Sequence, residues 1–311
     1  MSKSSSAVVF AYHDVGARCL RVLLAHGIDV VLVVTHADDP RENIWFERVA
    51  DVAAMNELRV ITPEDPNAHD VIARVAACVP DFLFSFYYRS MLKSALLALP
   101  RRGALNMHGS LLPKYRGRAP VNWAVLHGER HTGATLHYMT DKPDAGDIVA
   151  QQAVPILPDD TAADVIRKVA VAAEIALDGA LPALIAGTAP RVAQDLAQGS
   201  YFGGRAPEDG RIDWSRSAQQ IHDLVRAVAP PYPGAMTTIA GAPARILATR
   251  IIDDSATAPG EPLLEVGDGR ITVRCSGGGT LAICALEIDG TPIDAAGLLA
   301  RFGSATRLNE K

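Results

Sequence analysis

Apolar segments alternate with segments of helical spacing over the first two-thirds of the chain. Residues 29–35 are apolar after their first position, which is typical of a strand in a sheet covered on both faces. The same pattern predicts further strands at 7–11, 59–61, 81–85 and 103–107, and helices that end at Leu24 or span 43–58, 70–78 and 92–99. This βαβα order predicts an α/β fold with a doubly wound, Rossmann-like and mostly parallel sheet.

The next part of the chain predicts antiparallel strands, a long helix and a linker. Strands at 132–140 and 148–155 are joined at their tips by a turn that contains Gly and Pro. An Asp/Thr cap precedes an amphipathic helix at 161–184, after which residues 189–204 show no periodicity. We therefore expect a catalytic domain at 1–188, a linker at 189–204 and a second domain at 205–311.

The last hundred or so residues have a different pattern. After one helical segment at 217–227, short strands separated by turns predominate, and a further helix at 295–302 closes the series. The expected strands lie at 235–239, 244–248, 260–266, 270–275 and 280–288. Five short strands at this spacing predict a small OB-like β-barrel domain.

Composition narrows the class of partner. The 311 residues are 49% hydrophobic and 21% charged, which is ordinary for a globular protein of two domains. The formal net charge of -5 disfavours a protein that holds nucleic acid through a broad basic surface. We therefore expect a small-molecule substrate and no nucleic acid partner.

Cysteine spacing and hydropathy predict the compartment. The four cysteines lie far apart and lack the CxxC spacing of a zinc or redox site, so we expect reduced thiols. His127 and His131 have no third ligand at metal spacing, and we expect no metal. No run of about 18 uninterrupted apolar residues predicts membrane insertion. Cytoplasmic residence is the expectation, whereas the oligomeric state, a monomer or a weak oligomer, stays open.

The first turn argues against a dinucleotide cofactor. Residues 11–16 contain one glycine, and the GxGxxG pattern that cradles a pyrophosphate is missing. We therefore predict no NAD or FAD, although the strand and helix pattern is Rossmann-like.

Polar side chains at the end of one strand are the main candidate site. Asn106 and His108 share a face because side chains alternate along a strand, while Leu105 and Met107 point into the core. A Gly/Pro-rich loop follows, and Asp144 lies in a second turn downstream. An imidazole, an amide and a carboxylate suit acyl transfer without a covalent intermediate. A structural role for His108, and either a capping or a nucleophilic role for Ser110, remain open on spacing alone.

The same stretch resembles a known family signature. Residues 106–120 read Asn-Met-His-Gly-Ser-Leu-Leu-Pro-Lys-Tyr-Arg-Gly-Arg-Ala-Pro, and residues 144–149 read Asp-Ala-Gly-Asp-Ile-Val. Both resemble the folate-dependent formyltransferases. Within that family the likeness is greatest to the formyltransferase domain of a polymyxin-resistance protein. That domain acts on UDP-4-amino-4-deoxy-L-arabinose in lipid A modification. The similar segments are 9–14, 84–89, 108–123, 202–214 and 226–228, and no fused decarboxylase domain fits the length.

The resemblance implies a reaction and roles for the polar centre. It implies transfer of a formyl group from 10-formyltetrahydrofolate to the primary amine of a nucleotide-linked amino sugar. His108 then handles protons, Asn106 supports the oxyanion, and Asp144 holds and supports His108. The intact set of three favours an enzyme over a folate-binding protein that has lost turnover.

The resemblance also implies where the folate donor binds. Ser90, Met91 and Leu92 would line the pterin pocket, and the turn at 140–144 would close over it. Arg118 would pair with a phosphate or carboxylate. The residues expected to contact the donor or substrate are therefore Ser90, Met91, Leu92, Arg118, Thr140, Asp141, Lys142, Pro143 and Asp144.

Two related activities stay open as alternatives. A methionyl-tRNA formyltransferase would share the donor and the central motif, but the acidic net charge and the absence of a Lys/Arg-rich insertion near the loop disfavour it. A formyltetrahydrofolate hydrolase would use water as the acceptor and release formate. The sequence alone does not choose between amino sugars or between nucleotides.

Overall fold

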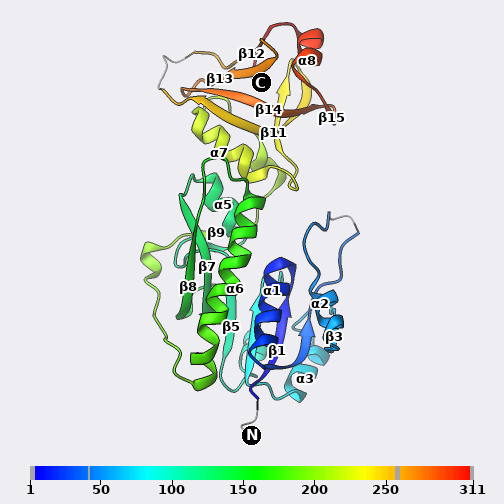
Figure 1. Ribbon diagram of the computed structural model, residues 1–311, viewed down its shortest axis with the longest axis vertical. Helices are drawn as coiled ribbons and strands as arrows, with labels where there is room; N and C mark the ends of the chain where they lie inside the picture. The colour runs from blue at the N-terminus through cyan, green and yellow to red at the C-terminus, as the bar shows by residue number, and fades with distance from the viewer. Residues whose placement is uncertain (1–3, 41–42, 256–259, 309–311) are drawn as a thin grey trace. The chain divides into compact units, whose positions relative to one another are not determined.

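The continuously apolar strands at the start of the chain form the centre of a seven-stranded sheet (Figure 1). In the computed structural model, which describes residues 4–40, 43–255 and 260–308, the sheet has the order β3-β2-β1-β4-β5-β7-β8. Its strands are β1 (Ser6–Ala11), β2 (Asp29–Val34), β3 (Val60–Ile61), β4 (Phe82–Phe86), β5 (Ala104–His108), β7 (His131–Tyr138) and β8 (Ile148–Pro155).

Strand pairing confirms the doubly wound α/β prediction. β1 pairs in parallel with β2 on one side and with β4 on the other, so the strand order reverses beside β1. Ala7 to Ala11 in β1 have no exposed surface, which explains their unbroken apolar run. β5 continues the parallel series beside β4, whereas β7 and β8 are antiparallel. The carboxyl ends of β1, β4 and β5 therefore meet at the edge where such sheets bind ligands.

Helices cover the sheet. They are α1 (His13–Ala25), α2 (Val49–Met55), α3 (His69–Ala77), α4 (Ser94–Leu97) and most of α6 (Ala162–Ala186), whereas α5 (Pro120–Leu126) belongs almost entirely to the second unit described below. α1 and α6 lie side by side (Figure 1), joined by an ion pair from Arg18 to Glu174 at 2.6 Å and by a hydrogen bond between His26 Nε2 and Asp178 Oδ1 at 2.8 Å. α6 is the one helix among the described residues with the length and hydropathy of a membrane span, but half of that window is buried inside the fold.

Two predicted helices are shorter than the sequence pattern indicates. The prediction at 43–58 is wrong at its start, because α2 begins only at Val49. The residues before it make tertiary contacts instead: Phe46 stacks on His13 with ring centroids 4.1 Å apart, and the Glu47 amide donates to Asp14. The helix expected at 92–99 is reduced to the single turn of α4. Before Val49, tertiary contacts with α1 thus outweigh the local preference for a helix.

Residues 189–204, where composition predicts a linker, contain short ordered elements. Val192 forms a β-bridge with Ile148 of β8. A 3₁₀ turn, η1 (Leu196–Gln198), is followed by β9 (Tyr201–Phe202), which pairs in parallel with β6 (Arg116–Gly117). The contacts of this segment belong to the first of two units into which the chain divides, made of residues up to Pro120, His131–Pro155 and Ile166–Gly203.

The second unit comprises Val121–Arg130, Ile156–Val165 and the chain from Gly204. Its antiparallel half-barrel sheet confirms the predicted OB-like domain and has the order β10-β11-β14-β13-β12-β16, with β15 beside β14. The strands are β10 (Ala235–Ile239), β11 (Ala242–Asp253), β12 (Leu263–Gly267), β13 (Arg270–Arg274), β14 (Thr280–Ile288), β15 (Thr291–Pro292) and β16 (Ala305–Arg307). Its helical elements are η2 (Pro207–Gly210), α7 (Ala218–Val228) and α8 (Ala295–Phe302).

A buried ion pair anchors α7 within the second unit. The Arg226 guanidinium donates to Asp223 Oδ1 at 2.6 and 2.8 Å and to the Asp160 carbonyl at 3.2 Å, and the side chains of the ion pair are each 6% exposed. We expect Arg226→Met to lower the free energy of unfolding by about 3 kcal/mol, because it leaves a buried carboxylate without its cation. Urea unfolding measures this loss. Adding Asp223→Leu removes the orphaned charge and restores most of the stability, whereas a double variant as unstable as Arg226→Met contradicts the assignment.

Candidate active site

The end of β5 presents the predicted polar pair. Leu105 and Met107 are buried in the core, whereas Asn106 and His108 lie on the opposite face of the strand. Asn106 is half-buried, and His108 is 6% exposed. Since β5 lies beside β4 near the point of strand reversal, the pair occupies the ligand-binding edge expected for this topology.

Asp144 joins this pair from the turn between β7 and β8. Its Oδ1 lies 3.5 Å from His108 Nδ1 and 3.4 Å from Asn106 Nδ2. Its Oδ2 accepts a 2.9 Å hydrogen bond from the Gly117 amide, which belongs to the loop after β5. The structure thus brings together all three residues that the sequence marks as a candidate centre.

Hydrogen bonding fixes the proton on the His108 ring. Its Nε2 lies 2.8 Å from the Tyr115 carbonyl oxygen, and a carbonyl only accepts, so Nε2 carries a proton. In the neutral ring the lone pair is therefore on Nδ1, the nitrogen that faces Asp144. His108 is arranged to take up a proton at Nδ1, next to a carboxylate.

Burial and charge give the two groups complementary protonation states. Burial lowers the pKa of His108 below its usual value and outweighs the opposing effect of Asp144. For Asp144, burial acts to raise the pKa, but the charge of His108, the neighbouring His137 and the Gly117 amide outweigh it and hold the pKa far below its usual range. A neutral base beside a permanent carboxylate results at neutral pH.

His137 is a fourth member of the centre that the sequence analysis missed. It stands opposite Asn106 in the antiparallel pairing of β5 and β7. Its Nδ1 donates to the Tyr138 carbonyl at 2.8 Å, and its Nε2 lies 3.1 Å from Asn106 Nδ2. Asn106 therefore donates to His137 through one N–H. β7 also contains two threonines and a second histidine, so His137 gave no distinct signal in the sequence.

The structure favours the capping role for Ser110. The residue has no exposed surface, and its hydroxyl donates to the Lys114 carbonyl at 2.6 Å. The Ser110 carbonyl in turn accepts from Thr135 Oγ1 at 2.6 Å. Ser110 closes the loop after β5, and this arrangement supports direct attack by a substrate nucleophile.

The segments expected to hold the folate donor lie side by side. Ser94 Oγ, just after the first segment, donates to Asp141 Oδ1 of the second at 2.5 Å. Ser90 is half-buried and Met91 is 57% exposed, while Leu92 is buried in the core. In the second segment the exposed residues are Thr140, Asp141 and Lys142, and Pro143 is half-buried. The hydrogen bond from Ser94 to Asp141 thus links the two segments near Asp144.

Arg118 lies on the same loop as the groups that hold Asp144 and His108. Its side chain is exposed, and its backbone amide donates to the Phe202 carbonyl at 3.0 Å. This hydrogen bond holds the backbone from which the charged Arg118 side chain extends. This placement suits a contact with an anionic part of a ligand.

Aromatic rings gather near the ends of β1 and β4. His13 stacks on Phe46, His36 stacks on Tyr88 at 4.1 Å, and the Arg89 guanidinium lies over the Tyr12 ring. Burial lowers the pKa of His13 to about 4, so this ring is uncharged at neutral pH. Flat apolar faces beside a polar centre suit a ligand that contains rings.

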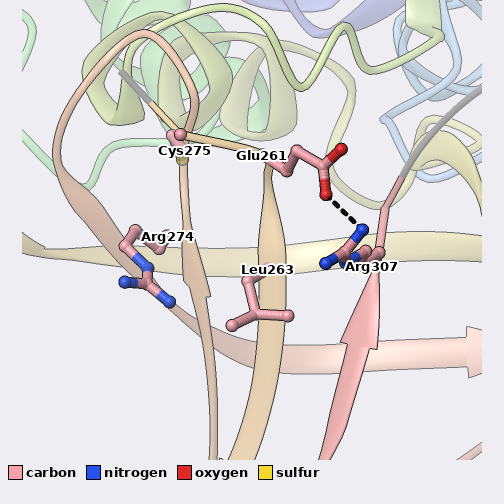
Figure 2. A pocket seen from close by; sticks show the side chains of 6 residues that line it. Glu261, Leu263, Arg274, Cys275 and Arg307 are labelled. Carbon is pink, nitrogen blue, oxygen red and sulfur yellow. Dashed lines mark ion pairs between the residues drawn. The ribbon is translucent and has the colours of Figure 1, made fainter. Parts of the chain in front are cut away.

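The second unit has a separate cavity of about 290 Å³ beside β12, β13 and β16 (Figure 2). Figure 2 shows Arg307 paired with Glu261, at 2.7 Å, and Leu263 between the two arginines of the rim. Burial raises the pKa of the Cys275 thiol to about 12, so it is not a nucleophile at neutral pH. Among the described residues no group of three or more His, Cys, Asp or Glu is placed to hold a metal ion. The polar centre on β5 is therefore the candidate active site.

Comparisons with known proteins find solved structures of similar fold. The chain resembles the crystal structure of an N-formyltransferase from Helicobacter canadensis in complex with folinic acid and dTDP-3-aminofucose, with 20% identity, a TM-score of 0.69 and coverage of 90% of this chain and 99% of that one. It also resembles WlaRD, a sugar 3N-formyl transferase, with 17% identity, a TM-score of 0.70 and full coverage of both chains. A third similar structure is a sugar N-formyltransferase from Shewanella sp. FDAARGOS_354, with 18% identity and a TM-score of 0.61. The match covers 78% of this chain and 96% of that one.

Family models cover most of the chain. Residues 9–181 match the formyl transferase family, and residues 205–303 match the formyl transferase C-terminal domain. The first match contains β5, the loop after it and the turn that holds Asp144. The chain belongs to the formyl transferase family.

Proposed function

We propose that this formyl transferase moves the formyl group of 10-formyltetrahydrofolate to the primary amine of a nucleotide-linked amino sugar. The observation that carries the proposal is the convergence of Asn106, His108 and Asp144 at the ligand-binding edge of the sheet. Two of the similar solved structures are sugar N-formyltransferases, and the N-formyltransferase from Helicobacter canadensis is in complex with folinic acid and a dTDP-linked amino sugar. We propose UDP-4-amino-4-deoxy-L-arabinose as the acceptor on the sequence resemblance.

The residues of the centre divide the chemistry between them. As the amine nitrogen bonds to the formyl carbon, it loses a proton, and His108 Nδ1 is placed to take it up. Asp144 stabilises the resulting imidazolium, because its carboxylate lies 3.5 Å from that nitrogen. The proton then goes to N10 of the donor as the bond from N10 to the formyl carbon breaks. Electron pairs and protons balance without a metal or a covalent enzyme intermediate.

Asn106 supports the oxygen of the tetrahedral intermediate. One of its two N–H groups faces His137 at 3.1 Å, and the other makes a long 3.4 Å contact with Asp144. The long contact is the weaker of the two, so this N–H is the one that an oxyanion takes over. Stabilisation of developing charge by a fixed donor is typical of acyl-transfer sites.

The donor fits the surface formed by residues 90–92 and 140–144. Ser90, Met91 and Leu92 have small or apolar side chains, which suit recognition of a pterin ring by backbone groups. The hydrogen bond from Ser94 to Asp141 holds the two segments together, so the donor would place its formyl group beside Asp144.

Arg118 is the proposed contact for the phosphates of the acceptor. We expect Arg118→Ala to raise the KM for the nucleotide sugar about tenfold, because a charge-assisted hydrogen bond is lost, with kcat changed less than twofold. Initial rates at varied acceptor concentration measure the effect. Arg59→Ala, just before β3, is the matched control and leaves KM unchanged. An unaltered KM in Arg118→Ala rules out the phosphate contact.

A panel of acceptors tests the proposed substrate class. The protein is incubated with 10-formyltetrahydrofolate and, separately, UDP-linked amino sugars, dTDP-linked amino sugars and methionyl-tRNA, and products are identified by mass spectrometry. We expect a formylated sugar nucleotide, with UDP-4-amino-4-deoxy-L-arabinose the fastest. Exclusive formylation of the tRNA contradicts the substrate class, and release of formate without any acceptor indicates the hydrolase.

A further inference from the structure

Residues 190–203, here called the strap, contact both loops that carry the candidate catalytic groups. Val192 bridges to Ile148, just after the turn that contains Asp144. Farther along, Tyr201 and Phe202 pair with Arg116 and Gly117 of the loop after β5. The composition of this segment predicted a linker, yet it connects the two parts of the active centre.

Gln194 of the strap holds the backbone of the aspartate turn. Its Nε2 donates to the Asp144 carbonyl at 3.1 Å and to the Gly146 carbonyl at 2.7 Å. Asp144 has a φ of +50°, a left-handed conformation that costs a residue with a side chain about 1 kcal/mol or more. External hydrogen bonds must offset that cost, and those from Gln194 reach the carbonyl of the strained residue itself.

Ser200 gives the strap a similar contact on the His108 side. Its hydroxyl accepts from the Tyr115 amide at 2.8 Å, and its carbonyl accepts from the Arg116 amide at 3.0 Å. The Tyr115 carbonyl is the group that accepts from His108 Nε2. The strap thus holds the backbone at Tyr115, which accepts from His108, and also the backbone at Asp144.

We propose that Gln194 is a positioning residue that keeps the Asp144 carboxylate beside His108 Nδ1. The hydrogen bonds of Gln194 go to the backbone carbonyls of Asp144 and Gly146, so the residue acts through the backbone of the turn. The claim that Gln194 contributes to catalysis rests on the proposed function. The claim that Gln194 keeps Asp144 close to His108 can be tested without measuring turnover.

Among the described residues, each member of this pair is influenced mainly by burial, by the other member and by His137. His108 faces Asp144 and also interacts with His137, and Asp144 faces His108, His137 and the Gly117 amide. The carboxylate raises the pKa of His108 against the effect of burial. When the turn is released and the carboxylate moves away, the pKa of His108 therefore falls.

Gln194→Met tests the proposal, because methionine keeps the length of the side chain and removes the amide donor. Gln198→Met is the matched control: Gln198 is exposed on the same strap and donates to Asp195 at 2.9 Å. We expect Gln194→Met to lower kcat about 10- to 100-fold, as displacements of about 1 Å do, with both KM values changed less than threefold. Gln198→Met keeps wild-type kinetics.

A double-mutant comparison separates positioning from general loss of structure. In the Asp144→Asn background, Gln194→Met should lower kcat less than about twofold, because the charge that it positions is already absent. A loss as large as in the wild-type background indicates a role that does not act through Asp144, and it overturns the proposal.

Imidazole NMR measures the same effect without substrate. With ¹⁵N-labelled histidine, assigned through a His108→Asn variant, the His108 titration midpoint should move to lower pH in Gln194→Met and stay in place in Gln198→Met. An unmoved midpoint in a folded Gln194→Met protein overturns the inference. A shifted midpoint in a protein that formylates no amino sugar overturns the proposed function alone.

Discussion

Replacing His108 by alanine lowers kcat about a thousandfold, because it removes the ring that takes up the amine proton. The ring nitrogen that accepts the proton is fixed by the hydrogen bond from Nε2 to Tyr115, and burial keeps the ring neutral at neutral pH. Single-turnover rates with saturating donor and acceptor measure the chemical step. The KM values change little, since the ring is buried and contributes little binding surface.

Folding and pH dependence provide the controls for this variant. If the circular dichroism spectrum and the thermal melting curve of the variant match those of the wild type, misfolding is excluded. In the wild type, kcat falls as the pH drops through the pKa of His108, which burial places below its ordinary value, so the acid limb lies below the usual histidine range. A folded His108→Ala protein with wild-type turnover removes the residue from the mechanism.

Replacing Asp144 by asparagine lowers kcat about a hundredfold or more, because the imidazolium formed during transfer loses its carboxylate. The side chain keeps its shape and retains an oxygen that accepts from the Gly117 amide. Since Asp144 raises the pKa of His108, its removal lowers that pKa, and the acid limb of kcat moves to lower pH. The pH dependence of kcat measures both effects.

Ser94→Ala is the matched control for Asp144→Asn. It removes the hydroxyl that donates to the neighbouring Asp141 and leaves the charge at Asp144 in place. We expect its acid limb to coincide with that of the wild type. An Asp144→Asn protein whose acid limb also coincides with the wild type contradicts the electrostatic coupling of Asp144 to His108.

Local sequence patterns sufficed for the sheet and for the neighbourhood of the centre. The unbroken apolar run of β1 reflects burial on both faces, and the alternation in β5 placed Asn106 and His108 together. The family signature then linked Asp144 to them. These features depend on residues close in sequence or on a motif of fixed spacing.

Contacts between residues far apart in the sequence could not be predicted from these local patterns. His137 meets Asn106 only because β5 and β7 are antiparallel in one particular register. Gln194 meets Asp144 across 50 residues of sequence, and nothing in the composition of the strap indicates that pairing. The helix expected at 43–58 is shortened for the same reason, because contacts with α1 decide the conformation before Val49.

The most direct test follows the formyl group itself. 10-Formyltetrahydrofolate labelled with ¹³C in the formyl group is mixed with UDP-4-amino-4-deoxy-L-arabinose and either the wild type or His108→Ala, and the sugar nucleotide is analysed by mass spectrometry. The wild type is predicted to place the label on the sugar nitrogen within the first turnover, and His108→Ala is predicted to place almost none there. Label recovered only as formate, or equal labelling of the sugar by both proteins, contradicts formyl transfer at this centre.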